Sequence, residues 1–509
     1  MKILDRIKNL LSNQSSAPQS PKQEDASGFM AFSHTGQVVA ARKALLEAGL
    51  NPQIKAPPPS LREGCDMVLE FPAELEAVYL AVLEEKKIRP LQVMAIDGPL
   101  TTPESLLKRS YFPEHYMVAA ANMKITVESG SGRVVNISGG GCPDVPYLAS
   151  LLSGKIVTEI EKPDELSRSL CSFSLAQATV EAARIFKSGA RPNSLPQDSA
   201  DHFSHPSLLP WPKNRPKPLN KPWLIVGTVS DPESPLGEGV FSWENKAVNW
   251  NGQQLSPERG TAALMAAYAI CAEFLGLPPG RAVLAGDNGG GEGSRAVYSW
   301  LLDNISNNPW SGLTFHYLFP EASSHDRIFL GLDELEPRPL LVADAGFMYV
   351  AKLCGQAPEY DLFTPDAGEM AYLADEKAPH PFYTRGALIH TEIDEKYIAE
   401  THRHGNAAQS MLVKGKTDRV VWRGNTVYRV DRPQVPAMEA IGGTGDTATG
   451  MASAFLAAGY SPPRASALAA HLNRLMGLSA LPTPGSGISE LISCLPALLH
   501  HELGRADGG

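Results

Sequence analysis

The chain has 509 residues, 45 of them basic and 55 acidic, for a net charge of −10. Hydrophobic residues make up 43% of it, which is enough for buried cores and excludes a wholly disordered chain. The sequence lacks the basic stripe that is typical of nucleic-acid-binding proteins. Its six cysteines, which include no CxxC pair, exclude a disulfide scaffold. The longest nearly apolar helical run, 262–272, is too short to span a membrane. We therefore expect a cytoplasmic, multidomain protein.

The N-terminal part predicts a flexible segment followed by a small domain. Residues 1–28 join a short amphipathic stripe to a stretch rich in Ser, Pro and Gln, which is typical of a stub and linker. Residues 29–97 predict a small α/β domain in which apolar runs alternate with amphipathic helices. Its expected elements are the strand 29–33, the helix 37–48, the strand 67–71, the helix 72–86 and the strand 91–96.

The next part predicts an α+β segment of unknown role over 98–186. Two alternating runs around a glycine turn indicate a β-hairpin at 123–138, and a helix is expected over 166–186. Residues 187–221 are rich in proline and unpatterned, as in an interdomain linker.

The longest predicted unit spans 222–505. Strand-like runs alternate there with helical ones, a pattern that favours a parallel sheet covered by helices on both faces. The expected strands are 223–229, 281–287, 313–319, 339–345 and 410–415.

A glycine-rich turn gives the sharpest local signal in this unit. Gly442, Gly443 and Gly445 bracket Thr444, and Asp446 then begins a predicted helix. A helix N-terminus offers free N–H groups and a positive dipole end, so glycines there let an anion approach the backbone. A carboxylate at this turn suits a base that takes a proton from a hydroxyl attacking a phosphoryl group. The alternative is an Asp that merely caps the helix.

Three further polar residues follow predicted strands of the same unit. Glu369 comes after the turn TPDAG, Asp344 ends the run LVADAG, and Lys414 lies in the strand LVKG. Ligands of open parallel sheets bind beyond the carboxyl ends of the strands, so we expect these side chains near one another.

Taken together, these motifs resemble the ribokinase-like superfamily. The pattern is most similar to the NAD(P)H-hydrate dehydratase group and the sugar-kinase-like proteins beside it, and it covers roughly 222–505. The fold implied is a layered, mainly parallel α/β sheet. Two departures concern the substrate: Asp366 stands where the family usually has His, and GDTATG replaces the commoner GDVLAG.

The resemblance implies ATP or ADP as phosphoryl donor, with Mg²⁺ oriented partly, and indirectly, by Glu369. It places the terminal phosphoryl group over the residues 442–445, close to Lys414, with Asp446 as the base. The implied substrate is a small molecule, either hydrated NADH or NADPH or the hydroxyl compound of a kinase. Members of this superfamily often assemble, so a homo-oligomer is compatible with the resemblance.

A second glycine-rich loop, 285–298, fits neither the P-loop nor the GxGxxG pattern. We interpret it as part of the same site, with Asp287, Asn288 and Arg295, together with Asp344, as substrate contacts. The alternative is a plain connection in which Ser294 caps the next helix.

Two cysteines are candidate reactive thiols. Residues 29–71 resemble a family of selenium/sulfur-carrier-like domains, which points to Cys65, although Asp66 beside it disfavours the thiolate. Cys142 follows three glycines at the start of a predicted helix, where the helix dipole favours a thiolate. The other four cysteines have apolar surroundings and are expected in the core: Cys171, Cys271, Cys354 and Cys494.

Three functions are compatible with these observations. The first is a nucleotide-dependent enzyme that phosphorylates a hydroxyl, as a dehydratase or a kinase. The second is a sulfur or selenium carrier or adaptor whose kinase-like domain is a nucleotide-gated scaffold. The third is a binding module without turnover, which an intact Asp446 argues against. We expect the first.

Overall fold

The computed structural model describes residues 26–58, 67–98, 102–103, 105–189, 216–307, 310–379 and 395–504. These residues divide into two compact units, one up to Leu106 and one from Leu107 onward. Cys65, nearly all of the predicted N-terminal stub and most of the predicted Pro-rich linker lie outside the described residues. No helix in the described ranges is long and apolar enough to cross a membrane.

The first unit is a four-stranded antiparallel sheet with two helices. Its elements are β1 (Ser27–Ala31), α2 (Thr35–Glu47), β2 (Gln53–Lys55), β3 (Val68–Pro72), α3 (Glu76–Glu85) and β4 (Gln92–Ala95). The strand order β2-β3-β1-β4, antiparallel at every step, is that of a ferredoxin-like βαββαβ motif. The helix α2 begins where the His34 ring accepts the N–H of Gln37.

Residues 107–188, called the accessory module below, open the second unit with an antiparallel meander. Its elements are β5 (Leu107–Tyr111), β6 (His115–Ala120), β7 (Met123–Glu128), β8 (Val134–Ser138), α4 (Val145–Leu152), α5 (Pro163–Leu166) and α6 (Leu170–Ser188). The hairpin predicted at 123–138 is confirmed as β7 and β8. The single helix predicted over 166–186 is wrong at its start, because Ser169 caps a new helix by accepting the N–H of Ser172.

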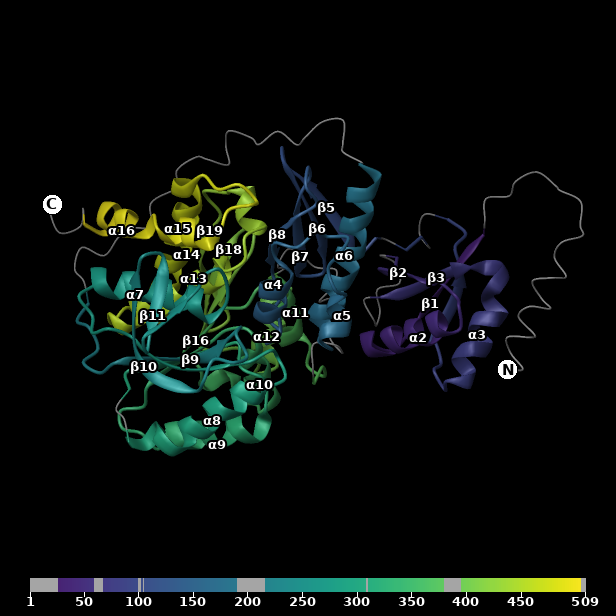
Figure 1. Ribbon diagram of the computed structural model, residues 1–509. Coiled ribbons are helices and arrows are strands. Elements are labelled where there is room, and N and C mark those ends of the chain that lie inside the picture. The colour runs from purple at the N-terminus through teal and green to yellow at the C-terminus, as the bar shows by residue number, and fades with distance from the viewer. Residues whose placement is uncertain are drawn as a thin grey trace, which may run out of the picture. The chain divides into compact units, whose positions relative to one another are not determined.

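An eleven-stranded sheet forms the rest of this unit (Figure 1). Its strands are β9 (Trp223–Val229), β10 (Gly237–Glu244), β11 (Ala247–Trp250), β12 (Gln253–Leu255), β13 (Arg281–Gly286), β14 (Gly312–His316), β15 (Leu340–Ala343), β16 (Leu362–Phe363), β17 (Ser410–Val413), β18 (Asp418–Trp422) and β19 (Asn425–Val430). The central order β13-β9-β14-β15-β16-β17 is parallel throughout, which confirms the predicted layered α/β fold. Antiparallel strands extend the sheet at both ends, so the whole sheet is mixed.

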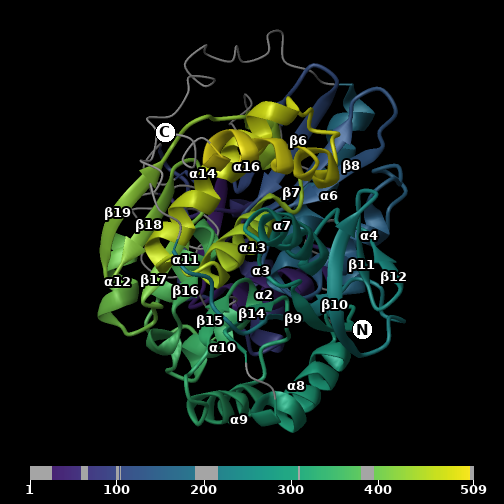
Figure 2. The same cartoon turned by 90° about the vertical axis from the view of Figure 1, so that its left-hand side faces the viewer.

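Helices cover both faces of this sheet (Figure 2). One face packs against α7 (Thr261–Phe274), α13 (Thr444–Ala457), α14 (Pro462–Ala480), α15 (Ile488–Ile492) and α16 (Leu495–Leu503). The other packs against α8 (Glu292–Asn304), α9 (Ala322–Asp333), α10 (Gly346–Leu353), α11 (Ala367–Ala374) and α12 (Glu395–Arg403). Side chains along β9 point alternately to the two faces of the sheet, so Ile225 packs in the first core and Leu224 and Val226 pack in the second.

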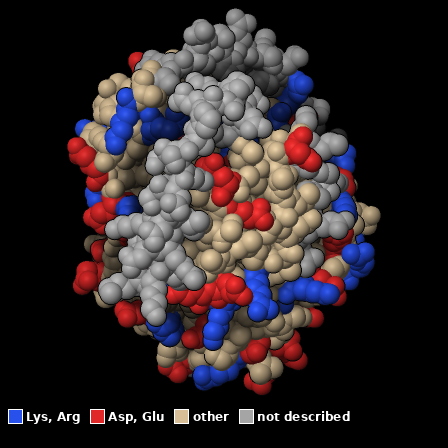
Figure 3. All heavy atoms as spheres, turned by 90° about the vertical axis from the view of Figure 1, so that its right-hand side faces the viewer, with Lys and Arg blue, Asp and Glu red and all other residues tan. Residues whose placement is uncertain are grey.

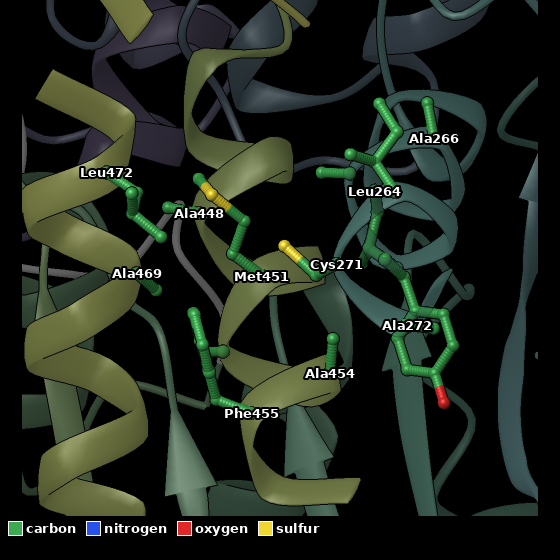
Figure 4. Packing of buried hydrophobic residues seen from close by; sticks show 14 of the residues in the cluster. Leu264, Ala266, Cys271, Ala272, Ala448, Met451, Ala454, Phe455, Ala469 and Leu472 are labelled. Atoms are coloured by element: carbon green, nitrogen blue, oxygen red, sulfur yellow. The ribbon is translucent and has the colours of Figure 1, made fainter. Parts of the chain in front are cut away.

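Small and flexible side chains pack the helices α7, α13 and α14 together (Figure 4). Met451 and Phe455 of α13 lie among the alanines and leucines of its neighbours, and all of these residues are buried. This packing matters for function because it fixes α13, whose first turn carries Asp446.

The surface in Figure 3 carries acidic and basic side chains interspersed around an area of other residues. Neighbouring charges of opposite sign largely cancel beyond a Debye length of about 10 Å at 0.1 M salt. The described part of this face therefore presents a mixed field.

Candidate active site

Four segments that are far apart in the sequence bring polar side chains to one edge of the parallel sheet. His316 ends β14, Asp344 follows β15 and Lys414 follows β17. Asp446 joins them from the first turn of α13. Because parallel strands end at the same edge, strand order alone gathers the first three residues, and the packing of α13 adds the fourth.

Asp446 is buried, and both of its carboxylate oxygens have partners. One lies 3.2 Å from His316 Nε2, and the other accepts the backbone N–H of Gly260 at 2.7 Å. Burial by itself raises the pKa of Asp446, but the hydrogen bond from His316 and the charges of Arg259 and Lys414 outweigh it. The pKa is lowered to about 2, so this carboxylate is ionised at neutral pH and is held in one orientation.

Asp344 and Lys414 form a buried ion pair next to Asp446. The ammonium Nζ lies 3.0 and 3.1 Å from the two oxygens of Asp344, and Thr449 donates its hydroxyl to the same carboxylate at 2.6 Å. Burial disfavours the charged ammonium, yet the nearby carboxylates, Asp344 foremost, raise the pKa of Lys414 overall. Removing one partner of such a pair typically costs about 3–5 kcal/mol, because a buried charge stays behind.

The first turn of α13 presents backbone N–H groups beside this ion pair. Gly443 is the N-cap, with a φ of 91°, and no side chain in the described structure caps this helix start. The amides of Thr444, Gly445 and Asp446 thus belong to the set that an α-helix leaves without an intrahelical partner. Lys414 Nζ would lie 3.3 Å from a Cβ placed on Gly445, so a cation stands at the same turn. Backbone donors and a cation together suit an anionic phosphoryl group.

The alternative role of Asp446 as a helix cap is wrong, because the cap is Gly443 and Asp446 lies three residues inside the helix. Its carboxylate reaches a different loop, at Gly260, instead of the N–H groups of its own helix. The side chain is therefore turned into the site.

Glu369 and Asp366 form a capping box at the start of α11. Asp366 accepts the N–H of Glu369 at 2.9 Å, and Glu369 accepts the N–H of Asp366 at 2.8 Å. Burial, followed by the negative charge of Asp366, raises the pKa of Glu369 well above its usual range, while Lys414 opposes the shift. A cation nearby would stabilise the ionised form of this carboxyl group, so its chemistry fits the predicted indirect contact with Mg²⁺.

The second glycine-rich loop is organised by Asp287 itself. One oxygen accepts the N–H groups of Gly289 and Gly291, and the other accepts the N–H and the hydroxyl of Ser294. Asp287 thus positions the loop, and the substrate contact expected of it stays a prediction.

The two other residues of that prediction, Asn288 and Arg295, are exposed at the same loop. Asn288 accepts the N–H of Gly290 at 2.9 Å, and Arg295 lies 3.4 Å from the carbonyl of Gly290. Ser294 does not cap α8, whose N-cap is Gly291. The alternative that assigned it this role is wrong.

Cys142 is buried, with 7% of its surface exposed, and precedes α4, which begins at Val145. Its side chain hydrogen-bonds that of Cys171, an interaction that, with burial, raises the pKa of the Cys171 thiol. A carrier thiol has to reach solvent as a thiolate, so the surroundings of Cys142 do not suit that role. Cys171 is also more than a core residue, since it pairs with Cys142.

His316 and Arg259 belong to this site although the sequence analysis did not select them. His316 is the last residue of its strand, so the rule about strand ends applied to it as much as to Asp344. Ligand atoms of His316, Asp344 and Asp446 lie within 4.8 Å of one another, an arrangement that can hold a metal ion. Lys414 already supplies a positive charge to this group.

Three family models match parts of the chain. A Se/S carrier protein-like model matches residues 27–95, and a model for a domain of unknown function matches 106–190. A model described as NAD(P)H-hydrate dehydratase matches residues 324–494, which include Asp344, Lys414 and Asp446.

Relatives extend these matches. Two uncharacterized proteins of Methanocaldococcus jannaschii, MJ1337 and MJ0011, are each 34% identical to the chain. The alignments cover 44% and 34% of this chain and 92% and 89% of the relatives. The ADP-dependent (S)-NAD(P)H-hydrate dehydratase of Cenarchaeum symbiosum is 35% identical over 35% of this chain and 58% of its own length.

Two solved structures each align with a little over half of the chain. One is a ribokinase-like superfamily protein from Enterococcus faecalis, 14% identical, covering 55% of this chain and 87% of its own, with a TM-score of 0.35. Another is an ADP/ATP-dependent NAD(P)H-hydrate dehydratase from Bacillus subtilis co-crystallized with ATP/Mg²⁺, also 14% identical. It covers 56% of this chain and 94% of its own, again with a TM-score of 0.35.

The predicted resemblances at both ends of the chain are thus confirmed by family models. MJ1337, which aligns over 92% of its length, is an uncharacterized protein and therefore indicates no activity. Residues 324–494 are thus similar to the NAD(P)H-hydrate dehydratase family and residues 27–95 to Se/S-carrier-like domains, and the chain is related to the uncharacterized protein MJ1337.

Proposed function

We propose that the C-terminal domain is a nucleotide-dependent enzyme that restores NADH or NADPH from the hydrated cofactor. The observation that carries the proposal is the ionised, buried Asp446 held beside the unpaired amides of the first turn of α13. Support also comes from the family match over 324–494 and from a relative named an ADP-dependent dehydratase.

In this proposal ADP or ATP, with Mg²⁺, supplies the phosphoryl group. The amides of Thr444 and Gly445 hold the charge that develops on it, and Lys414 neutralises part of that charge. Asp446 accepts the proton of the attacking substrate hydroxyl while His316 and Gly260 keep the carboxylate aimed. Phosphate then leaves with the oxygen that hydration had added, the neighbouring ring carbon gives up a proton to water, and the double bond of the reduced nicotinamide ring forms again.

A low pKa suits Asp446 to this task. Phosphoryl transfer proceeds through a loose transition state in which the attacking oxygen gives up its proton late. A carboxylate that is ionised at neutral pH is ready to receive this proton, and such general-base help is worth about 10²–10⁴-fold in rate.

A small-molecule kinase is the second candidate, and Asp366 is the observation that favours it. This residue stands where the dehydratases usually have His, and Asn122 of the accessory module donates to it at 3.0 Å. A changed contact here suits a different hydroxyl compound as acceptor. Both candidates share the phosphoryl-transfer step and differ in whether phosphate is then eliminated.

The deciding experiment compares the full-length protein with Asp446→Asn. Each is mixed with hydrated NADH, Mg²⁺ and either ADP or ATP, and the return of reduced-nicotinamide absorbance is followed. We expect kcat to fall by about 10²–10⁴-fold in the variant while nucleotide affinity is kept.

The matched control is Asp361→Asn. Asp361 is also a partly buried carboxyl group that accepts a backbone N–H, that of Leu341 at 2.8 Å, but it precedes β16 at the opposite end of the sheet. The activity of the Asp361→Asn variant should equal that of the wild type. No recovery of absorbance by the wild type, with Mg²⁺-dependent nucleotide binding intact, would exclude the dehydratase. Loss of activity in Cys65→Ser would instead favour the carrier.

A further inference from the structure

One short stretch of the accessory module lies against the loops that surround Asp446. This stretch, called the 137–146 segment below, runs from the end of β8 to the start of α4. It begins with Ile137 and contains the three glycines 139–141.

Arg259 fastens the 137–146 segment to the loop that orients Asp446. Its guanidinium group donates to the carbonyls of Ile137 at 2.6 Å and Gly139 at 2.5 Å. The next residue, Gly260, donates its N–H to Asp446. A continuous chain of contacts therefore joins the accessory module to the proposed base.

The same segment also contacts Tyr317, the residue that follows His316. Tyr317 donates its hydroxyl to the carbonyl of Gly140 at 3.1 Å. Tyr317 and Ala345 are also buried within the hydrophobic cluster of the accessory module, together with Val118 and Leu148. The residues next to His316 and Asp344 thus belong to the core of the module.

Two glycines show how closely the segment approaches the site. A Cβ placed on Gly141 would lie 2.0 Å from Glu369 Oε1 and 3.1 Å from the Tyr349 hydroxyl. A Cβ on Gly442 would lie 2.8 Å from the carbonyl of Ile137. At Gly442 the close atom belongs to the backbone, so a side chain has no room there, and at Gly141 either the segment or the Glu369 carboxyl group would have to shift.

Polar contacts from neighbouring strands anchor this arrangement at both sides of the segment. Ser138 donates to the carbonyl of Glu439 at 2.7 Å, just ahead of the glycine turn. Asn136 donates to the carbonyls of Pro484 and Ser486. On the other side, Asn122 donates to Asp366, which caps the helix that carries Glu369.

We propose that the 137–146 segment is the acceptor-side wall of the catalytic site, so that the accessory module determines which hydroxyl compound reaches Asp446. The segment contacts the residues that flank Asp446, His316 and the glycine turn, and it meets Glu369 directly. A substrate that approaches Asp446 from this side has to fit against the segment. The inference rests on the proposed function.

Gly141→Ala in the full chain tests the wall, with Gly130→Ala as matched control. Neither glycine has a positive φ, and a Cβ on Gly130 meets nothing within 4 Å. In Gly141→Ala the new methyl group pushes the segment away from Glu369. We expect KM for hydrated NADH to rise about tenfold or more, with the affinity for ADP unchanged within about twofold, because small misplacements cost much in such sites. Gly130→Ala should match the wild type.

Asn122→Ala supports the test if Gly141→Ala does not fold, since it removes a hydrogen bond and adds no bulk. It should raise KM in the same direction. Wild-type KM values in a folded Gly141→Ala, or in Asn122→Ala when the former is unfolded, would overturn the proposal.

Hydrogen–deuterium exchange of the wild type, measured once with ATP and Mg²⁺ and once with hydrated NADH, tests the proposed wall and the proposed function separately. We expect ATP and Mg²⁺ to slow exchange at 441–447, hydrated NADH to slow exchange at 137–146, and neither to change the turn at 129–133. Protection of 441–447 by ATP without protection of 137–146 by hydrated NADH would overturn the wall and leave the proposed function standing. No protection of either segment, with no recovery of absorbance, would overturn the proposed function and the wall with it.

Discussion

Two carboxyl groups of this site lie in the same buried surroundings, yet their pKa values shift in opposite directions. Burial raises both, but the hydrogen bond and charge of His316 and the charges of Arg259 and Lys414 lower the pKa of Asp446 to about 2. Glu369 faces Asp366, which raises its pKa further. Neighbouring groups, and not burial, therefore decide the direction of each pKa shift. As a result the Asp446 carboxylate is suited to accept a proton, and the Glu369 carboxyl group is suited to hold a proton or a cation.

His325 provides a pH-dependent contribution to stability. Its ring is 1% exposed, hydrogen-bonds the Tyr360 hydroxyl at 2.9 Å, and its pKa is lowered to about 4 by burial. Because the unfolded chain binds this proton at about pH 6.5, stability is kept above that pH and is lost as the pH falls toward 4.

We therefore expect the wild type to lose about 2 kcal/mol more free energy of unfolding between pH 7.5 and 5 than His325→Gln does. Glutamine keeps a hydrogen-bonding group but does not titrate in this range. Urea unfolding at the two pH values measures the difference, and the exposed His501→Gln is the control. Equal pH dependence in wild type and His325→Gln would contradict the assignment.

At the scale of elements, the site depends on how α11 is held at its far end. The helix carries Glu369 in its first turn. At its C-terminal end, Lys352 of α10 donates to the carbonyls of Tyr372, Asp375 and Ala378. Burial lowers the pKa of this lysine to about 8, yet the three carbonyls hold it in place as a cation at a helix C-terminus.

Lys352→Met should destabilise the protein by about 3 kcal/mol or more, since it leaves three carbonyls without their donor. Lys396→Met is the control, because the Lys396 side chain is 74% exposed on α12. The free energy of unfolding at pH 7 measures both changes. A cost below about 1 kcal/mol for Lys352→Met would show that water replaces the lost donor.

At the scale of the whole molecule, the accessory module and the large sheet form one compact unit, and the Se/S-carrier-like domain forms another. In the described chain, the three hydrophobic clusters of the second unit contain only residues from Leu107 onward. The described core of the second unit is therefore made of its own residues.

We therefore expect a chain of residues 107–509 to keep the stability and the kcat/KM of the full protein, and a chain of residues 216–509 to lose both. The shorter chain exposes Tyr317 and Ala345 and lacks the carbonyls that Arg259 binds. Unfolding curves and recovery of absorbance from hydrated NADH compare the two. Full activity of 216–509 would mean that the accessory module is dispensable.

The sequence by itself was sufficient for the parts of this protein that depend on short spacing. The turn GGTGD, the hairpin at 123–138, and the alternation of strands and helices are local features, because each depends on residues within a few turns of one another. Family resemblance follows the same motifs, so the C-terminal family and the Se/S-carrier-like domain were both predicted.

Tertiary structure alone decided which distant residues meet. His316 and Asp446 are 130 residues apart, and Asn122 and Asp366 are 244 apart, so no local pattern relates them. The order of the central strands and the packing of α13 on α7 create the first contact, and the docking of the accessory module creates the second. Such contacts depend on how whole elements pack, which is why the place of Asp446 at the start of a helix was predictable and its surroundings were not.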